Sequence, residues 1–262
     1  MAYDTMLYRA TITYGATVTL NQIVGPSTVR QGYGKAKMVS VQAFHHSTDA
    51  DDVGAKIQVD LKNNTWVRSQ KLWAGEFNAA TSHARNTTNY IYEHGYEVPV
   101  NSTFIVTATS FDAAAYDGTV TVDVLITIDY DAIPSINPDN YEGCPVTFTC
   151  TQSAGVSGSA GAIIRLGSYD VLDPGVTYCL NEITSSNVRG MMYVIIGGLQ
   201  PQQGLIRVLP CPDLGAKIVP TILGSVAFTK QSFDVSILSD GSVSSQIVPV
   251  YLELLASKNS LA

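Results

Sequence analysis

The chain has 262 residues, 45% of them hydrophobic, which is too apolar for a disordered protein and enough for one large or two medium domains. Only 14% of the residues are charged, against about 25% in an average soluble protein. The formal net charge is −7, and no run of Lys or Arg occurs. Because binding to the phosphates of nucleic acid requires clustered cations, this composition argues against direct nucleic-acid binding, both sequence-specific and sequence-independent.

The amino terminus, MAYDTMLYRATITYG, has no basic segment followed by an apolar core, so it does not resemble a secretory signal. No apolar stretch reaches the roughly 18 residues that a membrane span requires. We therefore expect a protein made in a cytoplasm, unless the sequence is a mature form from which a leader has been removed.

Strand patterns begin at once and continue through the first half. Apolar residues alternate with polar ones over 8–20, 39–43, 55–62, 104–108 and 119–130. This period of two predicts β-strands with one buried face. The strand at 119–130 is the clearest, with aliphatic residues at every second position from Val120 to Ile128, and we expect it to be half-buried. Asp117-Gly118 before it predicts a hairpin with the preceding strand.

Residues 75–90, GEFNAATSHARNTTNY, interrupt this pattern. They are the only stretch with helical character, and the sequence leaves open whether they form a helix or a long loop.

The second half shows the same pattern of alternating strand segments separated by turn residues. Strands are expected at 144–151, 191–198, 204–211, 222–229, 233–237 and 248–254. The run at 191–198 is fully apolar, which predicts a strand buried on both faces. Pro249 cannot donate a backbone hydrogen bond, so its strand is expected at a sheet edge or with a bulge there. Asp240-Gly241 precedes this last strand as Asp117-Gly118 precedes the strand at 119–130.

The parallel between the halves predicts an all-β protein of two tandem antiparallel β-sandwiches of jelly-roll type. Pro134 and Pro138 end the first half, so we place the first sandwich at 1–133, a linker at 134–142 and the second sandwich at 143–262. Each half then has roughly eight strands, which suits a sandwich.

No catalytic motif is present. The stretch GVSGS at 155–159 departs from a nucleophile elbow at its last position, and no phosphate-binding loop, dinucleotide fingerprint or zinc-protease motif occurs. We expect no enzymatic activity, no catalytic residues, no cofactor and no metal site.

Possible ligand residues each have a simpler structural interpretation. Adjacent strand residues His45 and His46 point to opposite faces, and we expect them, with His83 and His94, to be surface residues. The sequence leaves open whether the acidic loop residues bind a cation and whether the cysteines form disulfides. These residues are Asp49, Asp51 and Asp52, and Cys144, Cys150, Cys179 and Cys211.

Aromatic residues gather at 66–98. Trp66 and Trp73 flank Arg68 and Lys71, and tyrosines follow at 90, 92 and 96. Such residues fill a core or an interface, or stack on sugar rings.

With its paired closing hairpins around Asp117-Gly118 and Asp240-Gly241, its mid-chain linker and its length, the chain resembles viral major capsid proteins with double jelly rolls. The resemblance implies a structural virion protein that forms homotrimers and assembles into an icosahedral shell. It also implies contacts with other virion proteins and, in membrane-containing members, an internal lipid layer. The alternative is a virion decoration or spike protein, or a carbohydrate-binding protein, which the aromatic residues at 66–98 would favour.

Overall fold

The computed structural model is built from β-strands. It describes residues 2–47, 55–78, 83–85, 88–111, 119–131, 138–151, 163–165, 172–185, 192–199, 205–211, 217–218, 227–229, 234–239 and 247–258. In these ranges the only helix is one 3-10 turn, η2 (Pro138–Asn140). The all-β prediction is therefore confirmed. The chain divides into two compact units, one of Asp4–Ala132 and one made mainly of Ile133–Ala262.

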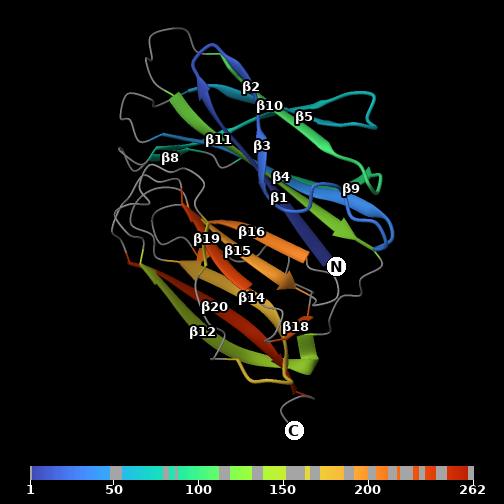
Figure 1. The fold of residues 1–262 in the computed structure, drawn as a ribbon, viewed down its shortest axis with the longest axis vertical. Helices are drawn as coiled ribbons and strands as arrows, with labels where there is room; N and C mark the ends of the chain where they lie inside the picture. Colours follow the sequence, from blue (N-terminus) through green and yellow to red (C-terminus); the bar gives the residue numbers. More distant parts are fainter. Residues whose placement is uncertain are drawn as a thin grey trace. The chain divides into compact units, whose positions relative to one another are not determined.

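The first unit contains two sheets (Figure 1). The larger has the order β3-β1-β11-β4-β7-β8, and β9 also pairs with β4. Its strands are β1 (Ala2–Thr13), β3 (Asn21–Val24), β4 (Ala36–Ser47), β7 (Gly75–Asn78), β8 (His83–Arg85), β9 (Thr88–Val98) and β11 (Thr119–Tyr130). The smaller sheet has the order β2-β10-β5-β6, with β2 (Thr17–Thr19), β5 (Ile57–Asn63), β6 (Gln70–Trp73) and β10 (Phe104–Ser110).

The second unit also contains two sheets, described by their backbones. One has the order β12-β20-β14-β17, with β18 also paired to β14, and the other has the order β13-β19-β15-β16. The strands are β12 (Tyr141–Thr151), β13 (Ile163–Arg165), β14 (Thr177–Ser185), β15 (Met192–Leu199), β16 (Leu205–Cys211), β17 (Lys217–Ile218), β18 (Ala227–Thr229), β19 (Asp234–Ser239) and β20 (Ile247–Ser257).

The two units share one nested plan of strand pairing. In the first unit β1 pairs with β11, β2 with β10, β4 with β9 and β5 with β6. In the second unit β12 pairs with β20, β13 with β19, β14 with β18 and β15 with β16. Early strands therefore pair with late ones, and the two middle strands pair with each other. Each unit resembles a long antiparallel ribbon folded over itself.

Side-chain alternation explains the core of the first unit. In β5 the buried residues are Ile57, Val59, Leu61 and Asn63, and in β10 they are Phe104, Val106, Ala108 and Ser110. The intervening residues are more exposed, so the sheet of β2, β10, β5 and β6 has one buried and one outward face. In the other sheet the residues at even positions from Val120 to Tyr130 in β11 are all buried.

The structure corrects the half-buried strand predicted at 119–130. Asp123, Leu125 and Thr127, on the opposite side of β11 from the aliphatic row, are buried as well. Polar residues are tolerated on this face because Asp123 is paired with Arg9 of β1. The strand is therefore covered on both faces along most of its length.

Both predicted closing hairpins are wrong. Strand β10 pairs with β2 and β5, whereas β11 lies between β1 and β4 in the other sheet. Likewise β19 pairs with β13 and β15, whereas β20 lies between β12 and β14. Consecutive strands therefore cross from one sheet to the other. The turn residues Asp117-Gly118 and Asp240-Gly241 lie outside the described residues.

Two further expectations also need correction. Residues 75–78, 83–85 and 88–90 belong to strands β7, β8 and β9, not to a helix or a long loop. Strand β7 pairs in parallel with β4, so the larger sheet of the first unit is mixed. Strand β20 is central and not an edge strand, and its pairing with β12 runs through Pro249 without the predicted bulge. Pro249 lies opposite Thr149 of β12, one residue beyond Val250, the last position described as paired with β14.

Candidate functional site

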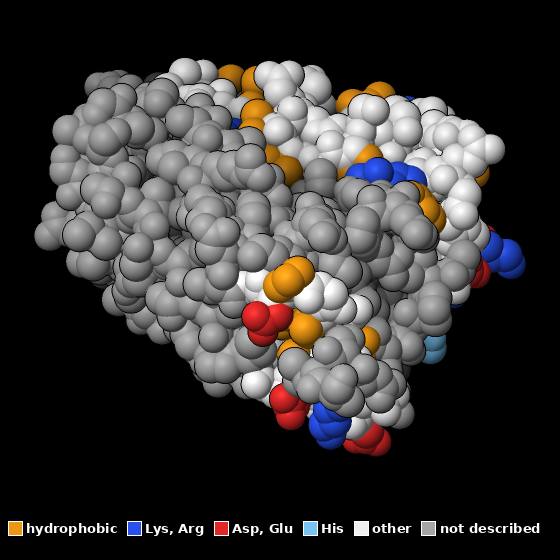
Figure 2. All heavy atoms as spheres, turned by 60° about the horizontal axis from the view of Figure 1, so that its bottom comes forward, with side chains coloured by type: hydrophobic (Ala, Val, Ile, Leu, Met, Phe, Trp, Pro, Cys, Tyr) orange, Lys and Arg blue, Asp and Glu red, His pale blue; other side chains and the backbone are white. Residues whose placement is uncertain are grey.

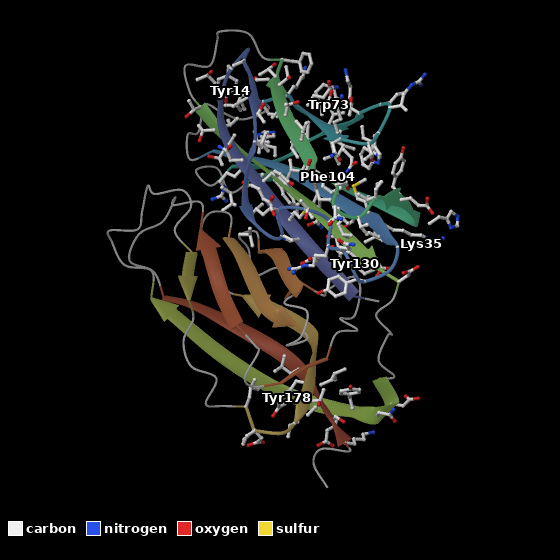
Figure 3. The ribbon with its side chains drawn as sticks, turned by 45° about the vertical axis from the view of Figure 1, so that its right-hand side comes forward. Tyr14, Lys35, Trp73, Phe104, Tyr130 and Tyr178 are labelled. Atoms are coloured by element: carbon white, nitrogen blue, oxygen red, sulfur yellow. The ribbon has the colours of Figure 1, made fainter. Side chains whose placement is uncertain are left out.

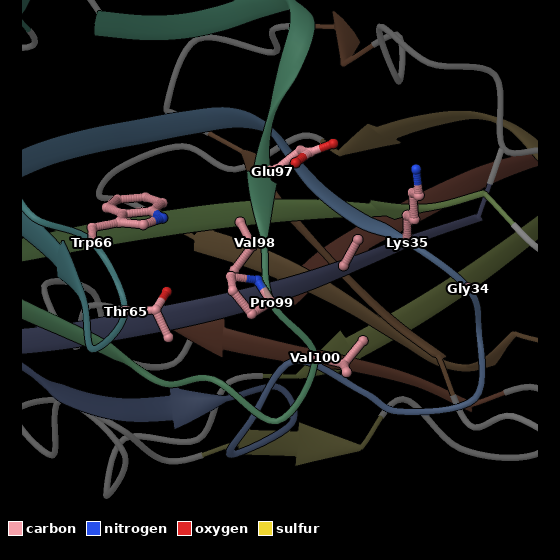
Figure 4. Close-up of a pocket in the computed structure, with 9 residues that line it drawn as sticks. Gly34, Lys35, Thr65, Trp66, Glu97, Val98, Pro99 and Val100 are labelled. Carbon is pink, nitrogen blue, oxygen red and sulfur yellow. The ribbon is translucent and has the colours of Figure 1, made fainter.

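A pocket of about 590 Å³ opens in the first unit, and Figure 4 shows the residues that line it. Three segments form it: the start of β4, the turn between β5 and β6, and the connection from β9 to β10. The lining residues are Gly34, Lys35, Ala36, Thr65, Trp66, Glu97, Val98, Pro99 and Val100. Its size falls in the range of small-molecule sites, which are mostly apolar with a few polar groups.

A hydrogen-bonded turn holds Trp66 in the pocket wall. The buried amide of Asn63 accepts hydrogen bonds from the Thr65 backbone N–H at 3.0 Å and the Thr65 hydroxyl at 2.6 Å. Its Nδ2 donates to the Ser102 hydroxyl at 2.9 Å, and Ser102 in turn donates to the carbonyl of Pro99. One side chain thus ties the β5–β6 turn to the β9–β10 connection.

The Trp66 ring packs edge-on against two neighbours. Its centroid lies 4.8 Å from that of Tyr96 and 5.8 Å from that of Phe104, both in T-shaped geometry. The indole nitrogen is buried and has no hydrogen-bond partner in the described structure. Packing on two sides fixes the ring, so Trp66 is a rigid wall of the pocket.

Trp73 lies in a different environment, on the outward face of the smaller sheet of the first unit (Figure 3). It is 48% exposed, and Phe111 beside it is 57% exposed. The two ring centroids are 5.7 Å apart with an interplanar angle of 54°. The structure therefore separates the two tryptophans that the sequence grouped together, one into a pocket wall and the other onto an open surface.

On the face that Figure 2 presents, the described charged side chains make no broad patch. Figure 2 shows small, separate groups of Lys or Arg and of Asp or Glu on the face it presents (Figure 2). Inside the first unit, Arg9 and Asp123 form a buried two-point ion pair, with 2.7 Å from Nε to Oδ1 and 2.9 Å from Nη2 to Oδ2. A second pair joins Arg30 to Asp4, whose side chain is fully buried.

Two tyrosines of the first unit have raised pKa values. Burial raises the pKa of Tyr8 to about 12. Burial also raises the pKa of Tyr130, and the Asp4 carboxylate adds to the rise. The Tyr130 hydroxyl accepts a hydrogen bond from the backbone N–H of Arg30 at 3.1 Å. Tyrosine is already protonated at pH 7, and burial moves the ionisation of these two hydroxyls further into the alkaline range.

The histidine prediction fails for one residue. His45 is buried in β4, with 2% of its surface exposed, and is not a surface residue as expected. His94 is exposed. The side chains of His46 and His83 lie outside the described part, as do residues 48–54 with Asp49, Asp51 and Asp52.

The cysteine question stays open. The backbones of Cys144 and Cys150 lie in β12, that of Cys179 in β14 and that of Cys211 in β16, but their side chains are not described. Among the described residues no group of three His, Cys, Asp or Glu side chains could hold a metal ion. No helix of the described part is long and apolar enough to cross a membrane.

Comparison with known proteins gives no family. No protein-family model and no curated protein matches the chain. Similar solved structures include the major capsid protein P2 of bacteriophage PM2, at 9% identity and a TM-score of 0.30, covering 98% of this chain and 99% of that one.

Two more similar structures differ in kind. The VP2 subviral particle of infectious bursal disease virus has 10% identity and a TM-score of 0.26, covering 98% of this chain and 72% of that chain. The CBM22-1-CBM22-2 tandem domain of Paenibacillus barcinonensis Xyn10C has 10% identity and a TM-score of 0.21, covering 98% of both. At these TM-scores the likenesses establish neither fold nor function for this chain.

Proposed function

We propose that the chain is a structural virion protein, a major capsid protein built of two tandem jelly rolls. The observation that supports this most is the nested strand pairing repeated in both units. A jelly roll has eight strands in two sheets. We treat β3, β7, β8 and β17 as additions, which leaves eight strands in each unit. The first of these strands then pairs with the last, the second with the seventh, the third with the sixth and the fourth with the fifth, as in a jelly roll.

The domain boundaries are part of this proposal. We place the first jelly roll at 1–133, the linker at 134–142 and the second jelly roll at 143–262. The two compact units of the structure divide between Ala132 and Ile133, which supports the first boundary. Strand β12 begins at Tyr141, so the last two linker residues would already belong to a strand of the second jelly roll.

The proposed assembly is a homotrimer that tiles an icosahedral shell inside the virion. Three chains with two similar modules each present six similar modules around one axis, and closed symmetry of this kind is the rule for self-associating proteins. Low charge suits such packing, because hundreds of neighbouring copies would otherwise repel one another. Other virion proteins and an internal lipid layer are the remaining proposed partners.

Electron microscopy of the expressed full-length chain tests this function. We expect trimers in solution and closed particles of uniform diameter, with the mass of the trimer given by light scattering. The alternative function, a virion decoration or spike, or a carbohydrate-binding protein that forms no shell, predicts small discrete oligomers under every condition. That result, with no particles at any ionic strength or protein concentration, would overturn the proposal.

A further inference from the structure

A row of side chains crosses the outward face of the sheet formed by β2, β10, β5 and β6. In the strand register Thr17 lies opposite Thr109, Thr109 opposite Gln58, and Gln58 opposite Trp73. We call these four residues the Trp73 row. Adjacent strands are separated by about 4.8 Å, so the row is about 14 Å long.

The Trp73 row faces outward because its immediate neighbours face inward. The next position along each strand is Val18, Ala108, Val59 or Leu72, and the last three are buried. In the row itself Thr17 and Trp73 are exposed, and Thr109 and Gln58 are partly exposed. Strict alternation therefore fixes four side chains from four strands on one open surface.

One end of the row carries an aromatic platform and the rest carries hydrogen-bonding groups. Trp73 and Phe111 form the platform, with 48% and 57% of their surfaces exposed. The hydroxyls of Thr17 and Thr109 are hydrogen-bonded to each other at 2.9 Å, and the Gln58 amide lies between them and Trp73. A parallel row alongside it offers Thr19, Thr107, Asp60 and Lys71.

We propose that the Trp73 row binds a neutral oligosaccharide of about three sugar units. A pyranose ring presents apolar C–H groups on its faces, which pack on an aromatic ring, and hydroxyls around its rim. Threonine hydroxyls and a glutamine amide both donate and accept, so they match rim hydroxyls of either polarity. Tryptophan supplies a large contact area with few rotatable bonds, which keeps the entropy cost of binding low.

Charge separates this ligand from other occupants. The four residues of the Trp73 row carry no charge. In the neighbouring row Asp60 and Lys71 lie opposite each other on adjacent strands and have charges of opposite sign, so that row has no net charge. A single-stranded nucleic acid also stacks on aromatic rings but requires a positively charged groove. A protein interface has its apolar residues at the centre of the patch, whereas here the aromatic pair lies at one end of a polar row.

Isothermal titration of the full-length protein with cellotriose, xylotriose and maltotriose tests the inference. We expect saturable binding of at least one of them, and a dissociation constant about tenfold or more higher in Trp73→Ala, because this ring supplies most of the apolar contact area of the row. Thr109→Val should weaken binding by a smaller factor. Ile105→Ala is the matched control, since Ile105 is exposed on the same face but away from the row, and it should leave binding unchanged.

A fluorescence measurement supplies the second readout. The chain has two tryptophans, so Trp66→Phe leaves Trp73 as the only tryptophan. With selective excitation of tryptophan, the bound trisaccharide should change the emission of Trp73. Circular dichroism melts establish that each variant is folded. Absence of binding by all three sugars at millimolar concentration overturns the inference, and so does unchanged binding by folded Trp73→Ala. Either result leaves the shell proposal standing, because assembly is measured separately by sedimentation.

A second copy of the chain is the competing occupant of this face. If Trp73→Ala changes the sedimentation of the protein and no sugar binds, the face is a contact between copies and the inference is wrong. If Trp73→Ala loses sugar binding and still assembles as the unmodified chain does, the inference holds.

Discussion

Arg9 and Asp123 join the first and last strands of the nested plan in the first unit. The guanidinium and the carboxylate make two parallel hydrogen bonds of 2.7 and 2.9 Å, across 114 residues of sequence. The side chains are 5% and 0% exposed. Two-point geometry of this kind fixes orientation as well as distance. The pair therefore fixes the register between β1 and β11, which the aliphatic residues of these strands alone would specify less sharply.

Removal of one partner should strongly destabilise the first unit. Asp123→Ala leaves the Arg9 charge buried without its carboxylate, and we expect a loss of about 3–5 kcal/mol in the free energy of unfolding, measured by urea denaturation. Lys62→Ala, at an exposed position of β5, is the control and should change stability by less than about 0.5 kcal/mol.

Removal of both partners should restore most of the stability. In the double variant Arg9→Met, Asp123→Leu no charge stays buried, and apolar residues of similar size often replace a buried pair at little cost. A double variant as unstable as Asp123→Ala alone would show that the loss comes from packing and not from the unpaired charge.

High pH should unfold the first unit through its buried tyrosines. The pKa of Tyr8 rises to about 12 in the folded protein, from about 10 in an unfolded chain. Below pH 10 both states hold the proton, so stability is unaffected. Between pH 10 and 12 only the folded state keeps it, so stability falls by about 1.4 kcal/mol per pH unit for this group.

Urea denaturation at pH 9 to 11.5 measures this slope. Tyr8→Phe removes the ionisable hydroxyl, and the variant should lose stability less steeply above pH 10 than the unmodified chain. Identical slopes for the two proteins would contradict a buried, neutral Tyr8 hydroxyl.

Two glycines with left-handed backbones should respond differently to alanine. Gly25 has φ +108°, and a Cβ there would lie 2.6 Å from the Thr5 carbonyl oxygen and 2.9 Å from the Met6 Cα. Gly32 has φ +93° and nothing within 4 Å of the same position. Both substitutions carry backbone strain of about 1–3 kcal/mol, and only Gly25→Ala also forces β1 to move.

Thermal melts compare the two variants. Gly25→Ala should have the lower melting temperature, because Gly32→Ala controls for the strain that both share. Equal melting temperatures would mean that the close approach of Gly25 to β1 has no energetic consequence.

The Asn63 amide should stabilise the wall of the pocket. Asn63→Ala leaves the Ser102 and Thr65 hydrogen-bonding groups without their buried partner, at a cost of about 1–3 kcal/mol. Because Trp66 follows this turn, its fluorescence in a Trp73→Phe background should shift toward that of exposed tryptophan. Unchanged emission would show that Tyr96 and Phe104 position the ring without Asn63.

Alternation in the sequence was enough to predict strands but not their partners. The period of two over 119–130 depends only on neighbouring residues, and β11 forms there. The pairing of β10 with β2, by contrast, joins Thr107 to Thr19 across most of the first unit. An Asp-Gly turn predicts reversal of the chain, and it leaves undecided whether the next strand stays in the same sheet.

Polar residues misled the prediction where a distant partner neutralises them. Asp123 suggested a solvent-facing side for β11, because nothing nearby in sequence indicates Arg9 as its partner. Residues 75–90 suggested a helix or loop because they are rich in Asn, Thr and Ala. The described residues of this stretch, 75–78, 83–85 and 88–90, form strands: β7 and β9 pair with β4, and β8 pairs with β7. Backbone pairing of this kind does not require apolar side chains.

Sedimentation velocity of the full-length protein over a hundredfold range of concentration tests the self-assembly of this chain most directly. The proposed capsid function predicts a trimer at low concentration and a second, much faster boundary of closed particles as concentration rises. A single boundary with the mass of one chain at every concentration and ionic strength would contradict it.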